Sequence, residues 1–326
     1  MARYSLGAKL LLSGLSMLSA GCLDQSSGST PSGDLENSRG RLNLSVTDAP
    51  VDFAAEVYVQ FSGIELTSST QTITLNFCED PANSTQWIAS PNPCAKSKPA
   101  AVNLLAMHSG SSARLLGNYP LGAGHYDSVR LLVNAVAGVD DSYVVLRNDT
   151  TNFKHDLDIP SDAEAGLKLN QGFNITAGGH LDLTIDFDLR KSVQPEVVGV
   201  YQLRPALRMV DNAKAGFIYG SVFGTDPALT DPSCTSAVYV YTGWGATTGD
   251  VGGSDGPLTS AVINIFPLDG DFAYGYKAAF LEAGNYTVAY SCEVANDDPS
   301  VDGTIAFLRT ANVTVPAQGS VPYNFQ

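Results

Sequence analysis

The sequence is poor in positive charge and in histidine. Of its 326 residues, 18 are Lys or Arg against 33 Asp or Glu, and four are His, so the formal net charge is −15. A protein that binds nucleic acid needs clustered cations to displace the counterions of the phosphate backbone, and docking on anionic lipid needs them as well. The composition therefore argues against nucleic acid and against an electrostatically held lipid surface as partners.

Catalytic and cofactor motifs are also missing. The sequence has no G-x-S-x-G, no H-E-x-x-H, no Walker loop and no Rossmann fingerprint. With four His and no nucleophile elbow, a Ser/His/Asp hydrolase has little to be built from. We predict that the protein is not an enzyme and has no cofactor. The enzymatic alternative that sequence leaves open is a glycosidase carboxylate pair.

After residue 22, no apolar run is long enough to span a bilayer. Residues 1–21 have the pattern of a secretory signal, with a basic start, a short apolar core over 10–18 and small residues before Cys22. Ala20-Gly21-Cys22 resembles a bacterial lipobox, in which the Cys is acylated and becomes the new N-terminus. The pattern prefers Leu where Ser19 stands. Ordinary cleavage that leaves Cys22 as an odd thiol is the alternative.

The lipobox resemblance implies that a lipid on Cys22 anchors the protein to a membrane. Leu23 follows the Cys, so the Asp that retains lipoproteins in the inner membrane is missing from that position, which favours the outer membrane. The periplasmic and cell-surface faces both stay open. Residues 22–39 are rich in Ser, Gly, Pro and acid, so we predict a disordered tether there.

The residues that are abundant favour β-structure. The chain has 31 Gly and 17 Pro, many Thr, Val and Tyr, and short segments that alternate apolar and polar residues. We predict an all-β protein of two tandem antiparallel β-sandwiches, Ig-like or prealbumin-like, over residues 40–211 and 212–326. The strands expected in the first are 41–46, 56–66, 72–77, 121–133, 143–147, 153–159, 166–170, 173–176, 180–189 and 199–210. Those expected in the second are 215–223, 237–241, 261–266, 273–280, 286–293, 304–308 and 312–325.

Two sequence signals occur twice in the same order. The motif L-x-A-G-x-Y followed by a strand is found at Leu121–Tyr126 and again at Leu281–Tyr286. The segment Asn174–Phe187 is then echoed by Asn312–Phe325, which we interpret as a hairpin. This order indicates two sandwiches of related plan.

Several local features can be predicted. Gly63 interrupts an alternating strand and indicates a β-bulge, and Val102–Met107 is the best candidate for a short helical turn. The segments Tyr143–Arg147 and Phe153–Ile159 have the pattern of a hairpin. Asp48, in Thr47-Asp-Ala-Pro50, is expected to accept backbone N–H bonds in a turn.

Apart from Cys22, the chain has four cysteines. An exported protein meets an oxidising compartment, so pairing is expected, and four cysteines allow three connectivities. We predict Cys78–Cys94 and Cys234–Cys292, because each bridge then stays within one sandwich. Zinc is the alternative, but no C-x-x-C occurs and the four His have no ligand spacing relative to the cysteines.

A set of motifs in the first sandwich resembles a known family. The motifs are Gly40–Pro50 (GRLNLSVTDAP), Val102–Leu105, Ala123–Tyr126 with Arg130-Leu131, Gly166–Lys168, Ile185–Asp188 and Leu203–Pro205. Together they are similar to the bacterial lipoprotein family called domain of unknown function 4382, over about residues 40–211. The resemblance implies an exported β-sandwich and assigns no catalytic residue. In the second sandwich, the L-x-A-G-x-Y motif alone resembles carboxypeptidase-regulatory and prealbumin-like sandwiches.

Two groups of residues are candidates for a binding site. Trp244, in a Gly-rich loop with Tyr239 and Tyr241 near it in sequence, could form a platform on which a sugar ring stacks. A Trp folded back over one end of the sandwich is the alternative. Asp182, Asp186 and Asp188 alternate along one strand and share a face, either as a solvated face or as a calcium site completed by a loop carboxylate.

These observations favour a non-enzymatic, lipid-anchored envelope protein that binds a protein partner or assists an envelope assembly. The alternative is a surface lipoprotein that binds carbohydrate, or another ligand with the help of calcium.

Overall fold

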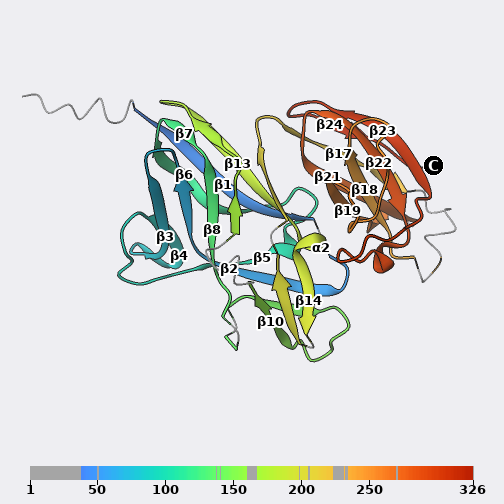
Figure 1. The fold of residues 1–326 in the computed structure, drawn as a ribbon, viewed down its shortest axis with the longest axis horizontal. Helices are drawn as coiled ribbons and strands as arrows, with labels where there is room; N and C mark the ends of the chain where they lie inside the picture. Colours follow the sequence, from blue (N-terminus) through green and yellow to red (C-terminus); the bar gives the residue numbers. More distant parts are fainter. Residues whose placement is uncertain are drawn as a thin grey trace, which may run out of the picture.

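The computed structural model describes residues 38–49, 51–136, 138–139, 141–159, 167–197, 199–204, 206–222, 231, 234–268 and 271–325 (Figure 1). The predicted signal peptide, Cys22 and nearly all of the predicted tether lie outside these residues. Within them, no helix is long and apolar enough to cross a membrane.

The chain is built almost entirely of strands, in two groups that we call the N-terminal half (β1–β16) and the C-terminal half (β17–β24). The N-terminal half contains β1 (Arg39–Ala49), β2 (Ala54–Thr67), β3 (Thr72–Asp80), β4 (Asn83–Ser90), β5 (Ala100–Asn103), the 3-10 turn η1 (Leu104–Ala106), β6 (Ala113–Gly122), β7 (Gly124–Tyr126), β8 (Ser128–Asn134), β9 (Tyr143–Leu146), β10 (Lys154–Asp158), β11 (Leu167–Leu169), β12 (Phe173–Ile175), β13 (His180–Asp188), the one-turn helix α2 (Leu189–Ser192), β14 (Val193–Val197), β15 (Val200–Leu203) and β16 (Leu207–Asp211). The C-terminal half contains β17 (Ala215–Val222), β18 (Ala237–Thr242), β19 (Thr259–Val262), β20 (Asn264–Leu268), β21 (Asp271–Glu282), β22 (Gly284–Ser291), the 3-10 turn η3 (Val294–Asn296), β23 (Arg309–Val315) and β24 (Ser320–Pro322).

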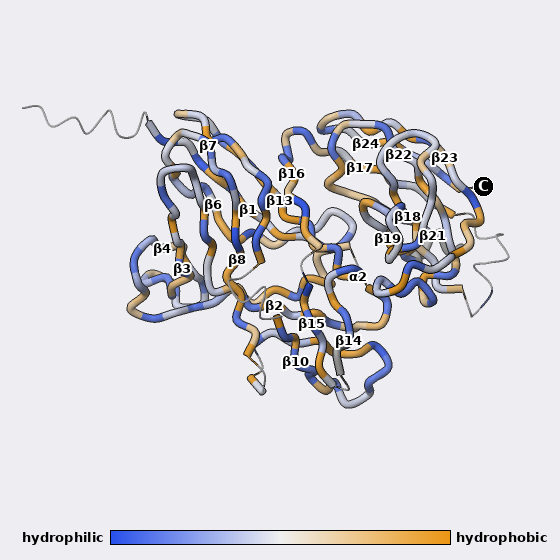
Figure 2. The backbone as a smooth tube through the Cα atoms, viewed as in Figure 1, coloured by the Kyte–Doolittle hydropathy of each residue, from blue (hydrophilic) through white to orange (hydrophobic). Residues whose placement is uncertain are grey.

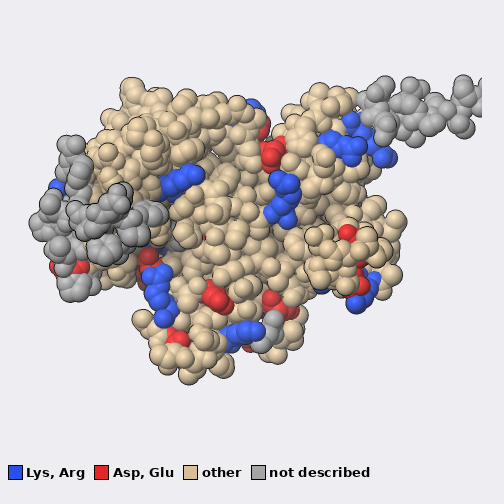
Figure 3. Space-filling view, turned by 180° about the vertical axis from the view of Figure 1, so that it is seen from behind, with Lys and Arg blue, Asp and Glu red and all other residues tan. Residues whose placement is uncertain are grey.

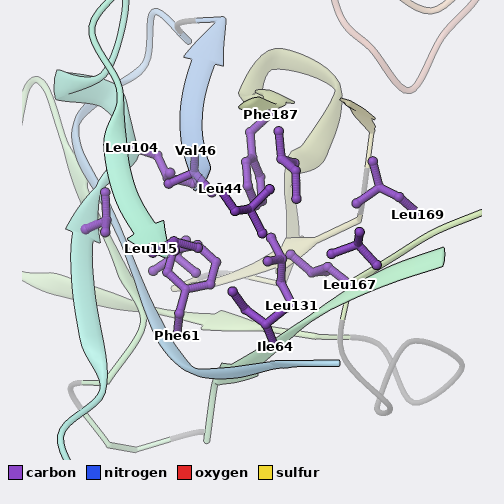
Figure 4. Close-up of a cluster of buried hydrophobic side chains, with 14 of the residues drawn as sticks. Leu44, Val46, Phe61, Ile64, Leu104, Leu115, Leu131, Leu167, Leu169 and Phe187 are labelled. Atoms are coloured by element: carbon purple, nitrogen blue, oxygen red, sulfur yellow. The ribbon is translucent and has the colours of Figure 1, made fainter. Parts of the chain in front are cut away.

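Two sheets enclose the core of the N-terminal half. One has the order β16-β13-β1-β6, and the other runs β11-β8-β2-β9-β10-β15-β14, with β3, β4 and β5 attached through β2. Apolar side chains from both sheets interdigitate between them, and Figure 4 shows Leu44 and Val46 of β1 close to Phe61 and Ile64 of β2 and to Phe187 of β13. The alternation of hydrophilic and hydrophobic residues along these strands, visible in Figure 2, puts one face of each strand into this core.

The C-terminal half is a smaller sandwich of two four-stranded sheets, β20-β21-β17-β24 and β19-β18-β22-β23. Ile218, Val240, Val288, Tyr290 and Phe325 are buried between them. Among the described residues, no strand pairing joins the two halves. The all-β prediction is confirmed, and the boundary at residue 211 stays a prediction.

The predicted antiparallel arrangement describes most of the strand pairs, but three pairs are parallel. They are β1 with β13, β10 with β15, and β17 with β24. Alternation along a strand reports which face is buried and carries no information about the direction of its neighbour, so the sequence could not reveal these pairs.

Two of the parallel pairs are the same construction, built once in each half. Arg41 N donates to Gly179 O at 2.9 Å in the first, and Phe217 N donates to Gly319 O at 3.0 Å in the second. A Cβ added at Gly40 would lie 2.4 Å from Thr176 O. A Cβ added at Gly216 would lie 2.5 Å from Gly319 O and 2.6 Å from Pro316 O. β1 and β17 therefore each need a glycine at the point where another turn crosses over them. In each case this is the turn that precedes the parallel partner strand, β13 or β24.

The repeated L-x-A-G-x-Y motif also has a common structure. The Tyr126 hydroxyl donates to Gly122 O at 3.2 Å, and the Tyr286 hydroxyl donates to Glu282 O at 2.7 Å. Both tyrosines are buried. A tyrosine that bonds back to the carbonyl four residues upstream fixes the corner where the chain passes from one sheet to the next, as in a tyrosine corner. The interpretation as two sandwiches of related plan agrees with this geometry.

Several local predictions are confirmed. The register of β2 on β8 shifts between Phe61 and Gly63, where a Cβ on the glycine would lie 2.4 Å from Leu75 O, so Gly63 is a bulge. The helical turn is η1, and β9 and β10 pair as the predicted hairpin. The structure also contains both predicted disulfides, Cys78–Cys94 and Cys234–Cys292.

Two predictions are wrong. Residues 312–325 do not form a hairpin, because β23 pairs with β22 whereas β24 crosses to the other sheet and pairs with β17. Residues 304–308 are not a strand. Phe307 of this segment instead packs edge-on against Tyr239 and Tyr241, so its apolar residues cover the outer face of β18 rather than extending a sheet.

Gly216, over which the turn before β24 crosses, yields a prediction about stability. We expect Gly216→Ala to lower the free energy of unfolding by about 1–3 kcal/mol, because the new methyl group overlaps backbone oxygens that cannot move independently. Gly284→Ala is the matched control, since the nearest atom to its Cβ position is 3.8 Å away. Thermal and urea unfolding of both variants measure the difference. Equal stability of the two variants would contradict the role given to the crossing.

Candidate functional site

Arg190 of α2 lies at the junction between the two halves. Its side chain is 4% exposed, its Nη2 pairs with Asp52 Oδ2 at 2.6 Å, and its Nη1 donates to Val294 O of the C-terminal half at 3.1 Å. Burial by itself lowers the pKa of Arg190, but Asp52 and other nearby groups outweigh burial and raise it. Arg190 is therefore a buried cation that is held charged by a partner in its own half and bonded to the backbone of the other.

Two further cations repeat this arrangement. Lys191 pairs with Asp188 and donates to Pro257 O. Arg208 pairs with Asp186 and donates to Phe280 O. Phe280 has a φ of 54°, a left-handed conformation that is costly for a bulky residue. The hydrogen bond from Arg208 helps to hold it there, so the strained residue belongs to the junction.

The three aspartates proposed as calcium ligands have other partners. Asp186 and Asp188 are ion-paired with Arg208 and Lys191 of their own half, and Asp182 accepts a hydrogen bond from Asn212 at 3.0 Å. Burial raises the pKa of both Asp186 and Asp188, and the neighbouring cations act in the opposite direction. Within the described part of the chain, no group of three or more His, Cys, Asp or Glu is placed to hold a metal ion. The interpretation of this strand as a solvated face is wrong for Asp186 and Asp188, which are buried.

Asp48 differs from these carboxylates because neither of its oxygens has a hydrogen-bond partner among the described residues. It is 6% exposed and borders a small polar cavity of about 20 Å³ between the halves, large enough for about one water molecule. Burial raises the pKa of Asp48 well above its usual range. Asp186 and Asp188 raise the pKa further, whereas Arg190 and the nearby Leu189 amide, which does not reach hydrogen-bond geometry with Asp48, lower it. The expected turn contacts of Asp48 are therefore not formed by its side chain.

A larger polar cleft of about 420 Å³ lies elsewhere along the same junction. Its walls come from both halves and include Asp52, His108, Arg147, Thr235 and Asn264. Because Asp52 also holds Arg190, one wall of this cleft depends on the ion pair that fixes the junction.

Trp244 is 60% exposed and sits in a tightly hydrogen-bonded loop after β18. The glycines on either side, Gly243 and Gly245, have φ values of 95° and 62°. Gly245 N donates to Asn312 Oδ1 at 2.8 Å. The Thr287 hydroxyl accepts from Ala246 N at 3.0 Å and lies 2.8 Å from Gly243 O. The loop backbone is thus fastened to β22 and β23 while Trp244 stays largely exposed, which does not fit the alternative of a Trp folded over the sandwich.

Tyr239 and Tyr241 do not join Trp244 in a platform, which corrects the predicted site. Both are buried, and both pack edge-on against Phe307. The Tyr239 hydroxyl donates to Asp297 Oδ2, and the Tyr241 hydroxyl donates to Gly249 O, each at 2.6 Å. The side chains that do border the Trp244 loop are Asn312 and Thr287, with Asn285 and Thr314 next to them. Sequence reasoning missed these residues, because only the pairing of β22 with β23 brings them together.

The four histidines lie apart in the fold. His108 bonds to Ser109, His125 contacts Asn174 and Asp127, and His180 bonds to Asn43. His155 lies edge-on against the rings of Phe153 and Tyr201. Among the described residues, none of these contacts joins a histidine to both a serine and an acid in the manner of a hydrolase triad. On the face drawn in Figure 3, charged side chains are scattered and neither sign forms a patch.

Comparison with known proteins identifies one family. Residues 39–205, just over half of the chain, match the model of a family described as Domain of unknown function (DUF4382). A search of curated proteins finds no match.

Solved structures with partial similarity include two from longer proteins. The leucine-rich repeat protein of Bacteroides thetaiotaomicron is 14% identical, with a TM-score of 0.21, over 88% of this chain and 26% of its own length. The TIE protein of Bacillus anthracis is 11% identical, with a TM-score of 0.18, over 89% of this chain and 34% of its own. GBS52, the minor pilin of Streptococcus agalactiae, is 11% identical, with a TM-score of 0.19, over 87% of this chain and 94% of its own length. This chain thus spans about a quarter to a third of the first two, and similarity of this degree identifies neither a ligand nor a partner.

The unpartnered Asp48 yields a prediction about pH. Because its pKa is raised in the folded state, the folded chain binds the proton more tightly, and its stability falls as pH rises from the unfolded pKa through the folded one. We expect Asp48→Asn, which cannot ionise, to be more stable than wild type at pH 7.5 by about 1–3 kcal/mol. The difference in stability between the variant and the wild type should decrease towards pH 4. Thermal unfolding across pH measures it, with Glu282→Gln as an exposed control. A variant less stable than wild type at pH 7.5 would show that Asp48 is satisfied.

Proposed function

We propose that this chain, which belongs to the family described as Domain of unknown function (DUF4382), is a non-enzymatic binding protein of the bacterial cell envelope. In this proposal a lipid on Cys22 anchors it to the outer membrane, and the exposed ring of Trp244 contacts its partner.

The observation that carries the proposal is the way in which Trp244 is displayed. Its ring is 60% exposed, yet its loop is fastened by hydrogen bonds to Asn312 and Thr287 and by the bond from Gly243 N to Asn285 O. An aromatic ring on a rigid backbone offers a large contact area and loses little conformational entropy on binding. Trp is also enriched among the residues that dominate binding energy. A ring held out in this way is suited to contact with another molecule.

The rest of the fold is suited to hold the Trp244 surface in a fixed position. The two disulfides and the junction cations make a stiff support, and stiff supports suit binding surfaces that work without moving parts. In Figure 1, with the long axis of the molecule horizontal, β1 begins at one end and β23, next to the Trp244 loop, lies at the other. A chain anchored through its N-terminus would therefore present the Trp244 surface away from the lipid.

The dispersed histidines and the absence of a metal-holding group among the described residues favour binding over catalysis. The lipid anchor is supported by the secretory pattern of residues 1–21 and the small residues before Cys22.

The anchor has a direct test. We expect the N-terminal peptide of protein purified from its native host to begin at Cys22 and to carry a diacylglyceryl mass. Cys22→Ala should move the protein from the membrane pellet to the soluble fraction, because a protein without the thiol has nothing to acylate. Mass spectrometry and fractionation measure both. An unmodified Cys22 in membrane-bound protein would refute the anchor.

The binding surface can be tested in cells. A photo-activatable phenylalanine analogue introduced at Trp244 should give a discrete cross-linked adduct on irradiation. The same analogue at Phe153, which is 59% exposed and so matches Trp244, should give none. The readout is a shifted band on a denaturing gel. Absence of any adduct at Trp244, or equal adducts at both positions, would contradict the proposed contact.

A further inference from the structure

The surface around Trp244 has a chemistry that narrows the class of ligand. It comprises the indole ring, the side chains of Asn285, Asn312 and Thr314, and Thr310 further along β23. We infer that this surface binds a neutral polysaccharide, with a sugar ring stacked on Trp244 and its hydroxyl groups accepting hydrogen bonds from the two asparagine amides. The inference rests on the proposed function at the same surface and adds the ligand class.

The two asparagine side chains are oriented by the protein. Asn312 Oδ1 accepts from Gly245 N at 2.8 Å and lies 3.1 Å from the Thr287 hydroxyl. Asn285 Oδ1 accepts from the Thr314 hydroxyl at 2.9 Å. Both residues are exposed. Because each amide oxygen is engaged within the protein, each Nδ2 is left as the group available to a ligand, and its direction is set before binding. Two oriented donors beside a flat ring suit a molecule that is rich in oxygen acceptors and has one apolar face.

The surface is also uncharged. The exposed side chains along β23 are Thr310, Asn312 and Thr314, at alternate positions that share a face. The chain as a whole carries a net charge of −15, but none of these three side chains is charged. An anionic polymer would meet an acidic protein with no cation on this strip, whereas a cationic one would find no carboxylate there. A neutral sugar needs neither a cation nor a carboxylate on the strip.

The strip lies on an edge strand, which allows a long ligand. β23 ends its sheet in the order β19-β18-β22-β23, and its seven residues pair with β22 in an unbroken register. The Trp244 loop is bonded through Gly245 N to Asn312, at the middle of this strand. A polymer can follow the strand beyond Trp244, so several sugar units can contribute to binding.

The aspartate variants make a sharp test. Asn312→Asp and Asn285→Asp keep the oxygen that accepts the internal hydrogen bond and remove the outward NH₂ donor. Asn83→Asp is the matched control, because Asn83 on β4 is exposed and its Oδ1 likewise accepts from a neighbour, Thr85. The full-length protein would be run in native affinity gels that contain dextran, laminarin, xylan or galactomannan, with the anionic polymer alginate as a further probe.

At least one neutral polysaccharide should retard the wild type and the Asn83→Asp control, and alginate should not. Trp244→Ala should abolish retardation, and each of the two aspartate variants should weaken it about threefold to tenfold, the effect of one hydrogen bond. Their melting temperatures should stay close to that of the wild type. Retardation that survives Trp244→Ala, or that Asn312→Asp and Asn285→Asp leave unchanged, would overturn the inference.

The failure of this inference can be separated from the failure of the proposed function. If none of the four neutral polymers retards the protein and mass spectrometry finds peptides of a second protein in the Trp244 adduct, the ligand is a protein. The glycan inference then falls while the binding role stands. If no polymer retards the protein and Trp244 gives no adduct, both fall.

Discussion

Three cations at one junction, the buried Arg190 and the half-buried Lys191 and Arg208, hold the molecule together. Arg190, Lys191 and Arg208 lie in or next to β13, α2 and β16, and each has a carboxylate partner in its own half and a backbone carbonyl in the other. Removing charges from water is costly unless their hydrogen-bonding groups find partners. These contacts therefore depend on a close fit of both halves, and a small displacement would leave charges buried without partners. The junction favours one relative position of the halves over many.

The strain at the junction fits this account. Phe280 adopts a left-handed conformation that presents its carbonyl to Arg208, and Asp48 remains unpartnered in the cavity nearby. Both features cost free energy locally. They are tolerated because the surrounding contacts outweigh them. Within each half the support is more regular, since Gly40 and Gly216 allow the same parallel crossing and Tyr126 and Tyr286 fix the same corner.

Sequence patterns predicted those parts of the fold that depend on local chemistry. Alternating residues marked most strands, Gly63 marked the bulge, and pairing cysteines within each half identified both disulfides. Patterns failed where distant segments meet. The parallel pairing of β24 with β17 depends on a crossing between sheets, which alternation does not encode. Tyr239 and Tyr241 are covered by Phe307, more than sixty positions later, so their burial was not readable from the strand that carries them. The Trp244 surface was half predicted: the ring was found, but its asparagines lie on strands that only folding brings to it.

The most direct test of this account is a distance measurement between the halves. Spin labels attached at Ser84→Cys on β4 and Thr310→Cys on β23, both exposed positions, would report the separation of the halves by pulsed electron resonance. The account predicts a single narrow distance distribution that broadens when Arg190 and Arg208 are replaced by Met. A broad distribution in the wild type, or a narrow one that survives both replacements, would contradict the claim that the junction cations hold the two halves as one rigid body.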